Sequence, residues 1–506
     1  KARWCTPAPR RKPTSLPISN YERREHERKT LVTAATVVFT LALTARLLPV
    51  FIYPSLNYPD EIFQSVEQAH RLVYGNGLVP WEFVYGTRSW FLPGVIAGLM
   101  EFARLFGAGP AYYLPIVGVA LATLGASSAL CAFLWGHRFY GYWGGILAGV
   151  FTAMWIDLAY FGPRPLSEVV AAHVLVIGLY LMAPGYVVSN WRRLASAGFL
   201  LGLAAMLRIQ LAPAVALIVL WPAEGWRRNL APLALGGFAV FLLFGALDWA
   251  TWSYPWESLY RNLALNLYYG ISGQWGVEPW YFYGGVIITY WTPIFAAAVL
   301  VLAYFGAYRE KRIVLAALAV FVVHSLIGHK EFRFIYPAIL LTAISAGIGL
   351  AYLIDRLSRQ SKPFILALPA MVVVILTSVV LLKTENYREL WTRDAAVMRA
   401  SVSVSQLPDV CGIELYGIPW FWSGGYWLMH QKVPLYWFEG EKDFAAHQDA
   451  FNTLVAAGDV PAPFEKKTCF GAVCLAQRPG SCAPLPMQQS IDQADIPSGL
   501  TPELKP

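Results

Sequence analysis

The sequence predicts an all-α protein that crosses a membrane many times. Of the 506 residues, 57% are hydrophobic and 14% are charged, whereas soluble domains carry about 25% charged residues. Apolar runs recur from Leu31 to Leu382, and they are much longer than the alternating strands of roughly 10 residues in a membrane β-barrel. Because only helices and closed barrels satisfy their own backbone groups in lipid, we expect these runs to be helices.

The N-terminal residues 1–30 are basic and polar, and we interpret them as a cytoplasmic tail ahead of a membrane anchor. The first apolar segment, Leu31–Tyr53, then spans outward. The formal net charge of +8 would also suit a nucleic-acid-binding protein. Much of the basic excess lies in this tail and in short loops, however, where the positive-inside rule places it in the cytoplasm. We therefore expect membrane lipids, and no nucleic acid, as partners.

Short basic clusters between the later apolar runs set the predicted topology. If every cluster is cytoplasmic, a domain over 31–383 forms about 11 transmembrane helices, and the apolar segment 89–106 lies along the membrane surface. After the first segment, the predicted spans are 110–135, 140–160, 167–184, 194–207, 210–221, 229–251, 284–306, 313–328, 335–354 and 363–383.

The C-terminal region, 384–506, is polar, and this topology places it outside the cytoplasm. Its aromatic runs Ile413–Tyr416 and Val433–Phe438 are typical of strands, and its Pro-rich end predicts disorder. An extracytoplasmic location favours one or two disulfides, whereas the cysteine spacing is a poor zinc pattern. The cysteines of this region are Cys411, Cys469, Cys474 and Cys482.

The predicted topology also collects the most polar intervals on one outer face. Charged groups near a membrane are energetically costly and therefore mark candidate functional sites. Their location on one face predicts a single site. These intervals are 54–88, 162–168, 207–213, 252–283 and 328–334.

Asp60 and Glu61 are the leading candidates for chemistry. They follow Pro59 and begin an amphipathic helical pattern that suits the membrane surface. Asp60 would serve as a helix N-cap, and Glu61 would suit the first turn. A carboxylate here would equally serve as a general base toward an acceptor hydroxyl. Both explanations stay open on spacing alone.

The remaining polar residues of these intervals also have two readings. Gln64, Glu67 and His70 form either a solvated helix face or part of a substrate site, and Arg88 is either an interfacial anchor or a phosphate ligand. Lys and Arg are the usual phosphate partners in proteins, and aromatic side chains suit sugar rings but also form interfacial belts. The further candidates are Arg164, Glu168, Arg208, Gln210, Trp275, Trp280, His329, Lys330, Glu331 and Arg333.

Several motifs together resemble a known enzyme family. The run PDExFQSxExAHxLVxGxG at Pro59–Gly77, followed by Trp81-Glu82 and by RSW at Arg88–Trp90, is similar to the Alg9/Pig-B-like mannosyltransferases of glycosyltransferase family 22. RPLSE at 164–168 and HKEFRFIYP at 329–337 match further signatures of that family. The resemblance covers roughly residues 30–355, in the family's order.

The resemblance implies a GT-C fold and an inverting hexosyltransferase that uses dolichyl- or polyprenyl-phosphate mannose. Asp60 then becomes the expected base, with Glu61 as its neighbour. The cations expected at the donor phosphate are His329, Lys330, Arg333, Arg164 and Arg208. The residues expected to contact substrate are Gln64, Glu67, His70, Arg88, Glu168, Gln210, Trp275, Trp280 and Glu331. No cofactor and no metal site are expected.

Other functions remain as alternatives. One is transfer of a different polyprenyl-phosphate sugar, and another is a lipid-glycan transporter or flippase, which would favour repeated halves and charges at the membrane midplane. Family members usually carry His before the Pro-Asp-Glu motif, where this chain has Asn57-Tyr58. The acceptor is expected to be a glycan or glycolipid, and the protein a monomer. The absence of Asn-x-Ser/Thr sites favours a bacterial inner membrane over the endoplasmic reticulum.

Overall fold

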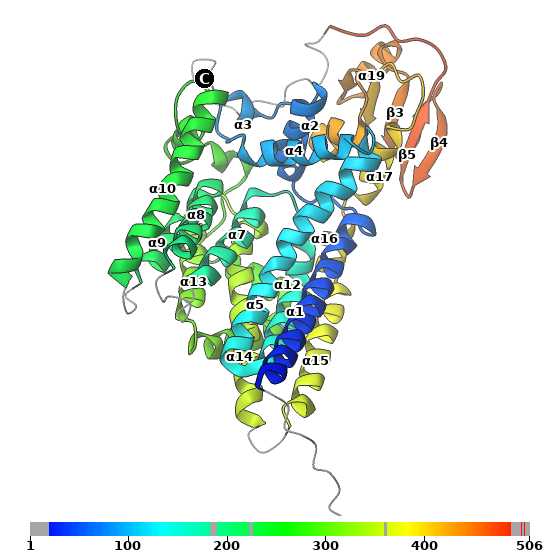
Figure 1. Ribbon diagram of the computed structural model, residues 1–506. Helices are drawn as coiled ribbons and strands as arrows, with labels where there is room; N and C mark the ends of the chain where they lie inside the picture. The colour runs from blue at the N-terminus through cyan, green and yellow to red at the C-terminus, as the bar shows by residue number, and fades with distance from the viewer. Residues whose placement is uncertain are drawn as a thin grey trace, which may run out of the picture.

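The computed structural model describes residues 20–182, 190–221, 226–358, 362–486, 497 and 500. It shows a tall bundle of helices with a cap of short helices and a small sheet at one end (Figure 1). The first part of the expected tail, residues 1–19, and the expected disordered end lie outside the described residues.

The bundle consists of apolar helices that pack against one another. Among the described residues, six helices are long and apolar enough to cross a membrane: α1, α5, α10, α12, α14 and α15. The bundle helices are α1 (Asn20–Phe51), α5 (Pro110–Met154), α6 (Ile156–Phe161), α7 (Ser167–Leu181), α8 (Trp191–Leu207), α9 (Ala212–Leu220), α10 (Trp226–Thr251), α12 (Phe282–Ala307), α13 (Lys311–Leu326), α14 (Tyr336–Leu357) and α15 (Phe364–Leu382).

Each predicted span falls on one of these helices, although the expected count of about 11 crossings is not confirmed. The predicted pair 110–135 and 140–160 corresponds mainly to α5, which bends where Tyr140 and Gly141 leave helical geometry. Gly141 has a φ of 66°, a left-handed conformation that glycine adopts without steric cost. The predicted pair 194–207 and 210–221 corresponds to α8 and α9, which are separated at Arg208.

Helix α1 begins earlier than expected. Residues 20–30, which were expected to belong to the polar tail, are the first turns of this helix. Glu25 forms ion pairs with Arg28 at 3.1 Å and with Lys29 at 3.8 Å. Pairs with these spacings lie on one side of a helix and stabilise it, so the polar segment continues the apolar helix rather than ending it.

The cap is built by the loop 54–88 after α1, which we call the first outer loop, and by the C-terminal region. Helix α4 runs across the end of the bundle in Figure 1, and its 14 residues correspond to most of the apolar segment 89–106. The cap helices of the outer loops are η1 (Ile62–Val66), α2 (Glu67–Tyr74), α3 (Trp81–Val84), α4 (Phe91–Arg104) and α11 (Glu257–Leu263). Short turns complete these loops at η2 (Ile209–Leu211), η3 (Ala264–Tyr268), η4 (Ile271–Trp275) and η5 (Phe332–Ile335).

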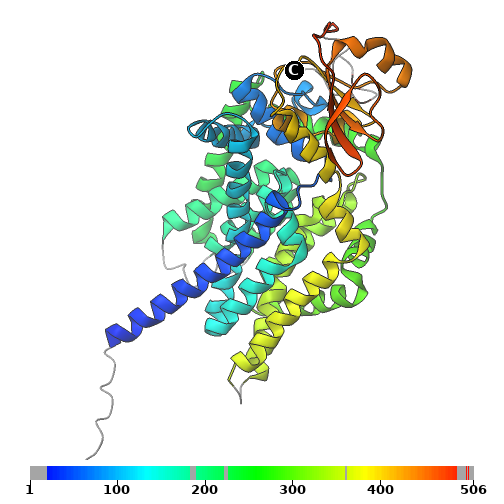
Figure 2. The ribbon, with the colours of Figure 1, turned by 90° about the vertical axis from the view of Figure 1, so that its right-hand side faces the viewer.

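The C-terminal region begins with helices and continues into a mixed sheet whose strand order is β2-β1-β3-β5-β4. Strand β1 is parallel to β2 and β3, whereas β5 is antiparallel to β3 and β4. Figure 2 shows this sheet at the cap end of the bundle. The elements are α16 (Glu385–Thr392), α17 (Ala395–Val404), β1 (Ile413–Tyr416), η6 (Trp420–Trp422), α18 (Gly425–Met429), β2 (Leu435–Tyr436), α19 (Glu441–His447), η7 (Gln448–Ala450), β3 (Thr453–Ala457), β4 (Glu465–Phe470) and β5 (Val473–Gln477).

Two expectations for this region are confirmed. Strands β1 and β2 fall within the two aromatic runs that predicted strands. The four cysteines form two disulfides, Cys411–Cys482 and Cys469–Cys474. Both disulfides join segments of the sheet region, and neither links it to the bundle.

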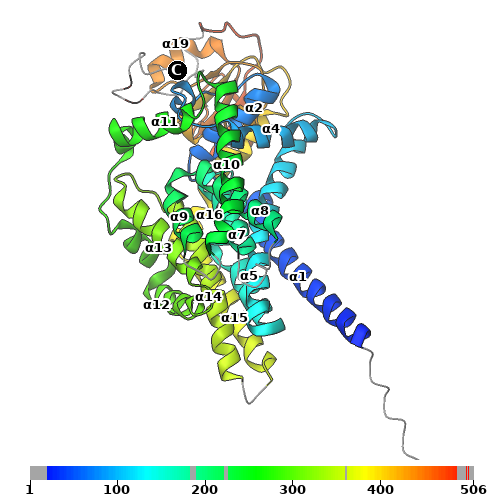
Figure 3. The ribbon, with the colours of Figure 1, turned by 60° about the vertical axis from the view of Figure 1, so that its left-hand side comes forward.

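Buried hydrogen bonds attach the C-terminal region to the first outer loop. The carboxylate of Glu67 accepts the backbone amides of Leu78 at 2.8 Å, Tyr426 at 3.1 Å and Trp427 at 2.8 Å. Because a buried carboxylate without partners is energetically costly, these bonds favour one position of α18 over the loop. Figure 3 shows α2 and α4 together at this end of the molecule.

Candidate active site

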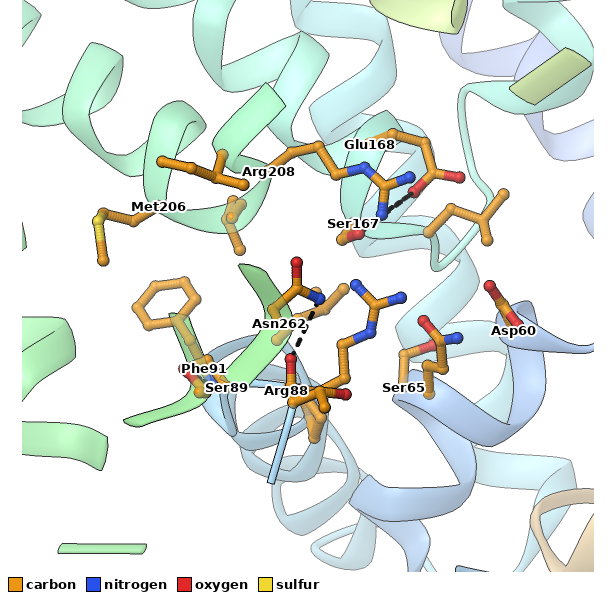
Figure 4. A pocket seen from close by; sticks show the side chains of 18 of the residues that line it. Asp60, Ser65, Arg88, Ser89, Phe91, Ser167, Glu168, Met206, Arg208 and Asn262 are labelled. Carbon is orange, nitrogen blue, oxygen red and sulfur yellow. Dashed lines mark hydrogen bonds and ion pairs between the residues drawn. The ribbon is translucent and has the colours of Figure 1, made fainter. Parts of the chain in front are cut away.

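A cavity of about 910 Å³ lies between the bundle and the cap. Its walls come from the first outer loop, the break between α8 and α9, the aromatic loop 252–283, the segment before α14 and the C-terminal region. A smaller cavity of about 80 Å³ shares Asp60, Arg88 and Arg208 with it and also includes Ser167 and Glu168 (Figure 4). Residues of all five polar intervals therefore meet in one place, as their predicted topology requires.

Arg333 lies at the centre of the charged groups in this site. Its guanidinium contacts Asp60 Oδ2 at 2.5 Å, Glu331 Oε2 at 2.7 Å and Glu168 Oε1 at 3.2 Å. The ring of Tyr58 lies 4.9 Å from the same guanidinium. A planar guanidinium held by three carboxylates has few orientations available. Arg333 therefore orients Asp60, and these acids offset its positive charge.

Asp60 points into both cavities and does not cap a helix. Asp60 itself already has helical structure. Among the described residues, Asp60 makes its side-chain hydrogen bond through Oδ2, to Arg333. Its side chain is 27% exposed, so the other oxygen can meet a hydroxyl group that enters the cavity. This geometry favours the catalytic interpretation over the capping one.

Two other arginines face the same space. Figure 4 shows Arg88 and Arg208 on opposite sides of it, with Asp60 at its edge. Among the residues that the structure describes, Arg208 forms one ion pair, with Glu168 at 3.8 Å, and Arg88 forms none. The Nε atoms of both arginines are buried without a hydrogen-bond partner. Two guanidinium groups with unused donors form a suitable site for an anion such as a phosphate.

His329 and Lys330 line the larger cavity but are held by neighbouring groups. Lys330 Nζ donates to the carbonyl oxygens of Glu278 at 2.7 Å, Gly328 at 3.3 Å and Ile327. His329 lies between the carbonyl oxygen of Gly276 at 3.1 Å and Glu331 Oε1 at 3.0 Å. Burial disfavours the imidazolium, but the hydrogen bonds with Glu331 and with the carbonyl oxygen of Gly276, together with the charge of Glu331, raise the pKa of His329. The ammonium group of Lys330 lies near the cavity, but the three carbonyl oxygens leave it few N–H groups for a ligand.

Glu61 and Arg164 lie outside this site, contrary to the expectation that they act beside Asp60. Glu61 Oε2 pairs with Arg164 Nη1 at 3.1 Å. Arg164 also donates to the carbonyl oxygen and hydroxyl of Ser55, at 2.5 and 2.6 Å. Both charged residues line a different cavity. Successive residues on a helix point about 100° apart, which directs the two acids of the pair to different sides.

Three further residues expected at the substrate lie elsewhere. Glu67 and His70 are fully buried and connect the outer loop to the C-terminal region, where His70 Nε2 lies 3.0 Å from His430 Nδ1. Trp280 is 73% exposed and lines neither cavity of the site. In contrast, Gln64, Gln210 and Trp275 do line the larger cavity.

Sequence reasoning missed two contributions to the cavity. Glu82 lines it and accepts a hydrogen bond from Gln64 at 2.6 Å. Burial, and then the neighbouring charge of Asp60, raise the pKa of Glu82 to about 7. The Trp81-Glu82 motif in the sequence could have indicated Glu82 as a site residue. The aromatic segment Trp420–Trp422 also lines the cavity, and no motif in the C-terminal region indicated it.

Within the described residues, no group of three or more His, Cys, Asp or Glu side chains is placed to hold a metal ion. The site is instead a set of carboxylates and guanidinium groups beside a partly aromatic cavity. Such a set can accept a proton from a hydroxyl and stabilise a phosphate.

The chain is similar to enzymes that transfer mannose. It is 29% identical over 342 residues to GPI mannosyltransferase 3 of Drosophila melanogaster, covering 64% of this chain and 56% of that one. It is 25% identical over 369 residues to GPI alpha-1,2-mannosyltransferase 3 of Mus musculus, covering 68% and 64%. The matches thus span less than two thirds of these relatives. Both relatives are animal proteins, so the expected bacterial inner membrane finds no support in them.

Solved structures show the same fold. ArnT from Cupriavidus metallidurans bound to undecaprenyl phosphate has a TM-score of 0.56 at 15% identity, covering 90% of this chain and 98% of that chain. The apo state of ArnT has a TM-score of 0.57 at 14% identity, covering 88% and 98%. The fold is therefore the GT-C fold, as expected. Together with the apolar helices, it identifies an integral membrane protein.

The model of the Alg9-like mannosyltransferase family matches residues 37–399. This range includes the bundle from the middle of α1 onward and every predicted site residue described above. It ends within α17, so the sheet and the aromatic segment Trp420–Trp422 lie beyond the matched range. The chain belongs to the Alg9-like mannosyltransferase family.

Proposed function

We propose that this protein is a mannosyltransferase that moves mannose from a dolichyl- or polyprenyl-phosphate donor to a hydroxyl group of a glycolipid. The observation that carries this proposal is the position of Asp60. Its carboxylate lies at the edge of a space with Arg88 and Arg208 on opposite sides (Figure 4). A proton acceptor and an anion site thus lie in one cavity.

The proposed reaction is a single displacement at the anomeric carbon. The acceptor hydroxyl oxygen bonds to this carbon while the bond from the carbon to the donor phosphate oxygen breaks. Asp60 receives the hydroxyl proton, and the lipid phosphate leaves with the electron pair. Arg88 and Arg208 stabilise the charge that develops on the phosphate, an effect that is usually the largest catalytic contribution. Attack opposite the leaving group inverts the anomeric configuration.

The comparisons support the choice of substrates. Relatives are named GPI mannosyltransferases, so a GPI precursor is the first glycolipid acceptor to test. The ArnT structure contains undecaprenyl phosphate, which supports a lipid phosphate as the donor. We expect the protein to act as a monomer.

The charge distribution supports an extracytoplasmic site. Basic clusters such as Arg192-Arg193 and Arg227-Arg228 begin helices α8 and α10, at the end of the bundle away from the cap (Figure 1). The positive-inside rule places that end in the cytoplasm. The cap, with the cavity and the C-terminal region, then lies on the opposite side.

The test is a transfer assay with the purified full chain in nanodiscs. The donor is labelled polyprenyl-phosphate mannose, the acceptor is a synthetic GPI precursor, and parallel reactions contain EDTA. We expect a mannosylated product that resists EDTA. Binding of donor without product, with the GPI precursor and with membrane glycolipid extract alike, would contradict the proposed reaction. A product formed only from a different polyprenyl-phosphate sugar would contradict mannose as the transferred sugar.

A further inference from the structure

A third cavity, of about 410 Å³, lies between α1, α5, the first outer loop and the C-terminal helix α17. We call it the side pocket. The side pocket lies on the opposite side of the turn that contains Asp60. Glu61 and Arg164 face the side pocket, whereas Asp60 faces the two cavities of the candidate active site, which we together call the reaction cavity. Neither the proposed reaction nor any contact described for the reaction cavity uses this pocket.

Most of the side pocket is apolar and borders two helices that can cross a membrane. Val50 of α1 and Leu114, Val117 and Leu121 of α5 line it, and both helices are candidate membrane spans. The last residue of α1, Phe51, is not part of the pocket lining and is 53% exposed. Exposed apolar side chains on a membrane helix face lipid, so a lipid chain can lie next to this pocket.

One wall of the pocket carries a buried carboxylate with an unused oxygen. Glu61 is 2% exposed, and its Oε2 is paired with Arg164. Its Oε1 is buried, and no group of the described residues has the geometry of a hydrogen bond to it. A buried polar atom without a partner costs about 1–3 kcal/mol, so this oxygen favours a ligand that brings a donor.

An apolar space with a hydrogen-bond acceptor at its wall fits an amphiphile. We propose that the side pocket binds one membrane lipid, whose hydrocarbon chain lies along the α1 and α5 lining and whose head group donates an N–H or O–H to Glu61. The exposed guanidinium of Arg399, which also lines the pocket, suits the phosphate of such a head group.

This lipid site is separate from the substrate cavity and goes beyond the proposed transfer reaction. Because Glu61 directly follows Asp60, a lipid that occupies the pocket also fixes the turn that presents Asp60 to the reaction cavity. The bound lipid is therefore expected to support activity without being consumed.

The test uses a lipid probe and does not depend on transfer. The full chain is placed in phosphatidylcholine nanodiscs that contain a trace of phosphatidylethanolamine with a diazirine in its acyl chain. After illumination, labelled peptides are identified by mass spectrometry. Labelling is expected on peptides from α5 and α17, which line the pocket, and an excess of unlabelled phosphatidylethanolamine is expected to compete with it.

A matched pair of variants of α5 locates the binding. Leu114→Trp adds a large side chain at the pocket wall, whereas Val119→Trp changes a 40% exposed position outside the lining. Filling the pocket removes chain burial and should lower labelling by about tenfold or more, whereas Val119→Trp should leave it unchanged. Val402→Trp, on α17, provides a second filled variant in case the first does not elute as a monodisperse protein.

The outcomes separate this site from the proposed function. Equal labelling of the filled and control variants, or labelling spread evenly over exposed helices, would overturn the lipid site. A probe with a trimethylammonium head group, which has no N–H donor, should label less, and equal labelling would overturn the role of Glu61. If wild type is labelled in the pocket but forms no mannosylated product, the transferase proposal fails while the lipid site stands.

Discussion

Replacing Asp60 by Asn tests the proposed chemistry most directly. The variant keeps the size of the side chain and an oxygen that can accept from Arg333, but it loses the ability to take a proton. Arg333 retains Glu331 and Glu168 as partners at 2.7 and 3.2 Å. The fold should therefore lose only about 1 kcal/mol.

The expected kinetic effect is much larger than this structural effect. A positioned general base contributes about 10²–10⁴-fold to a rate, which corresponds to about 3–5 kcal/mol in the activation barrier. We expect kcat to decrease by a factor within this range. The affinity for the lipid-phosphate donor should change little, because Arg88 and Arg208 remain in place.

The assay measures initial rates with labelled polyprenyl-phosphate mannose and a GPI precursor, with donor binding measured separately. Asp459→Asn is the matched control, because Asp459 is exposed in the C-terminal region and lines neither cavity of the site. A variant with Asn at 60 that keeps more than about a tenth of the wild-type rate would refute the assignment of Asp60 as the base.

Three further predictions concern the anion site, a buried acid and the disulfides. Arg88→Gln should raise the KM for the donor by about 10–100-fold, since a hydrogen bond to a charged group contributes about 1.5–3 kcal/mol; an unchanged KM would place the phosphate elsewhere. Burial raises the pKa of Glu414 to about 8, so the fold favours its neutral form and stability should decrease as pH rises from about 4.5 to 8. Glu414→Gln should remove this decrease, which thermal unfolding at pH 5 and pH 8 would detect; an identical pH dependence in the variant would contradict it. Cys482→Ser opens a disulfide whose cysteines are 71 residues apart, and Cys474→Ser opens one with a separation of 5, so chain entropy predicts losses of about 4 and 2 kcal/mol. Equal shifts of Tm in the two variants would contradict that ranking.

The positions of the helices and the meeting of the polar loops could be predicted from sequence. Long apolar runs have few possible structures in lipid, and basic clusters order them. Once the loops are on one face, Asp60, Arg208 and Arg333 are expected on the same side of the bundle. The structure brings these residues to the walls of shared cavities.

The division of roles within each loop could not be predicted in the same way. Glu61 has the same charge as Asp60, but its partner Arg164 lies 103 positions away in the chain. Glu67 looks like part of a solvated helix face, and only the docked C-terminal region shows that it is buried. Such assignments depend on contacts between distant segments, which local patterns do not contain. In contrast, the early start of α1 depends on local charge pairs and was readable from sequence.

The hydrogen bonds of Glu67 have a consequence for how the protein is made. Its two acceptor bonds to the C-terminal region join residues 359 and 360 positions apart. During synthesis, the first outer loop emerges long before the segment that completes its hydrogen bonds. Contacts of such high sequence separation form late, so the reaction cavity acquires its Trp420–Trp422 wall only in one of the last assembly steps. A growing chain therefore contains the acidic residues of this loop well before it can use them, and quality control that recognises an exposed Glu67 loop would detect unfinished molecules.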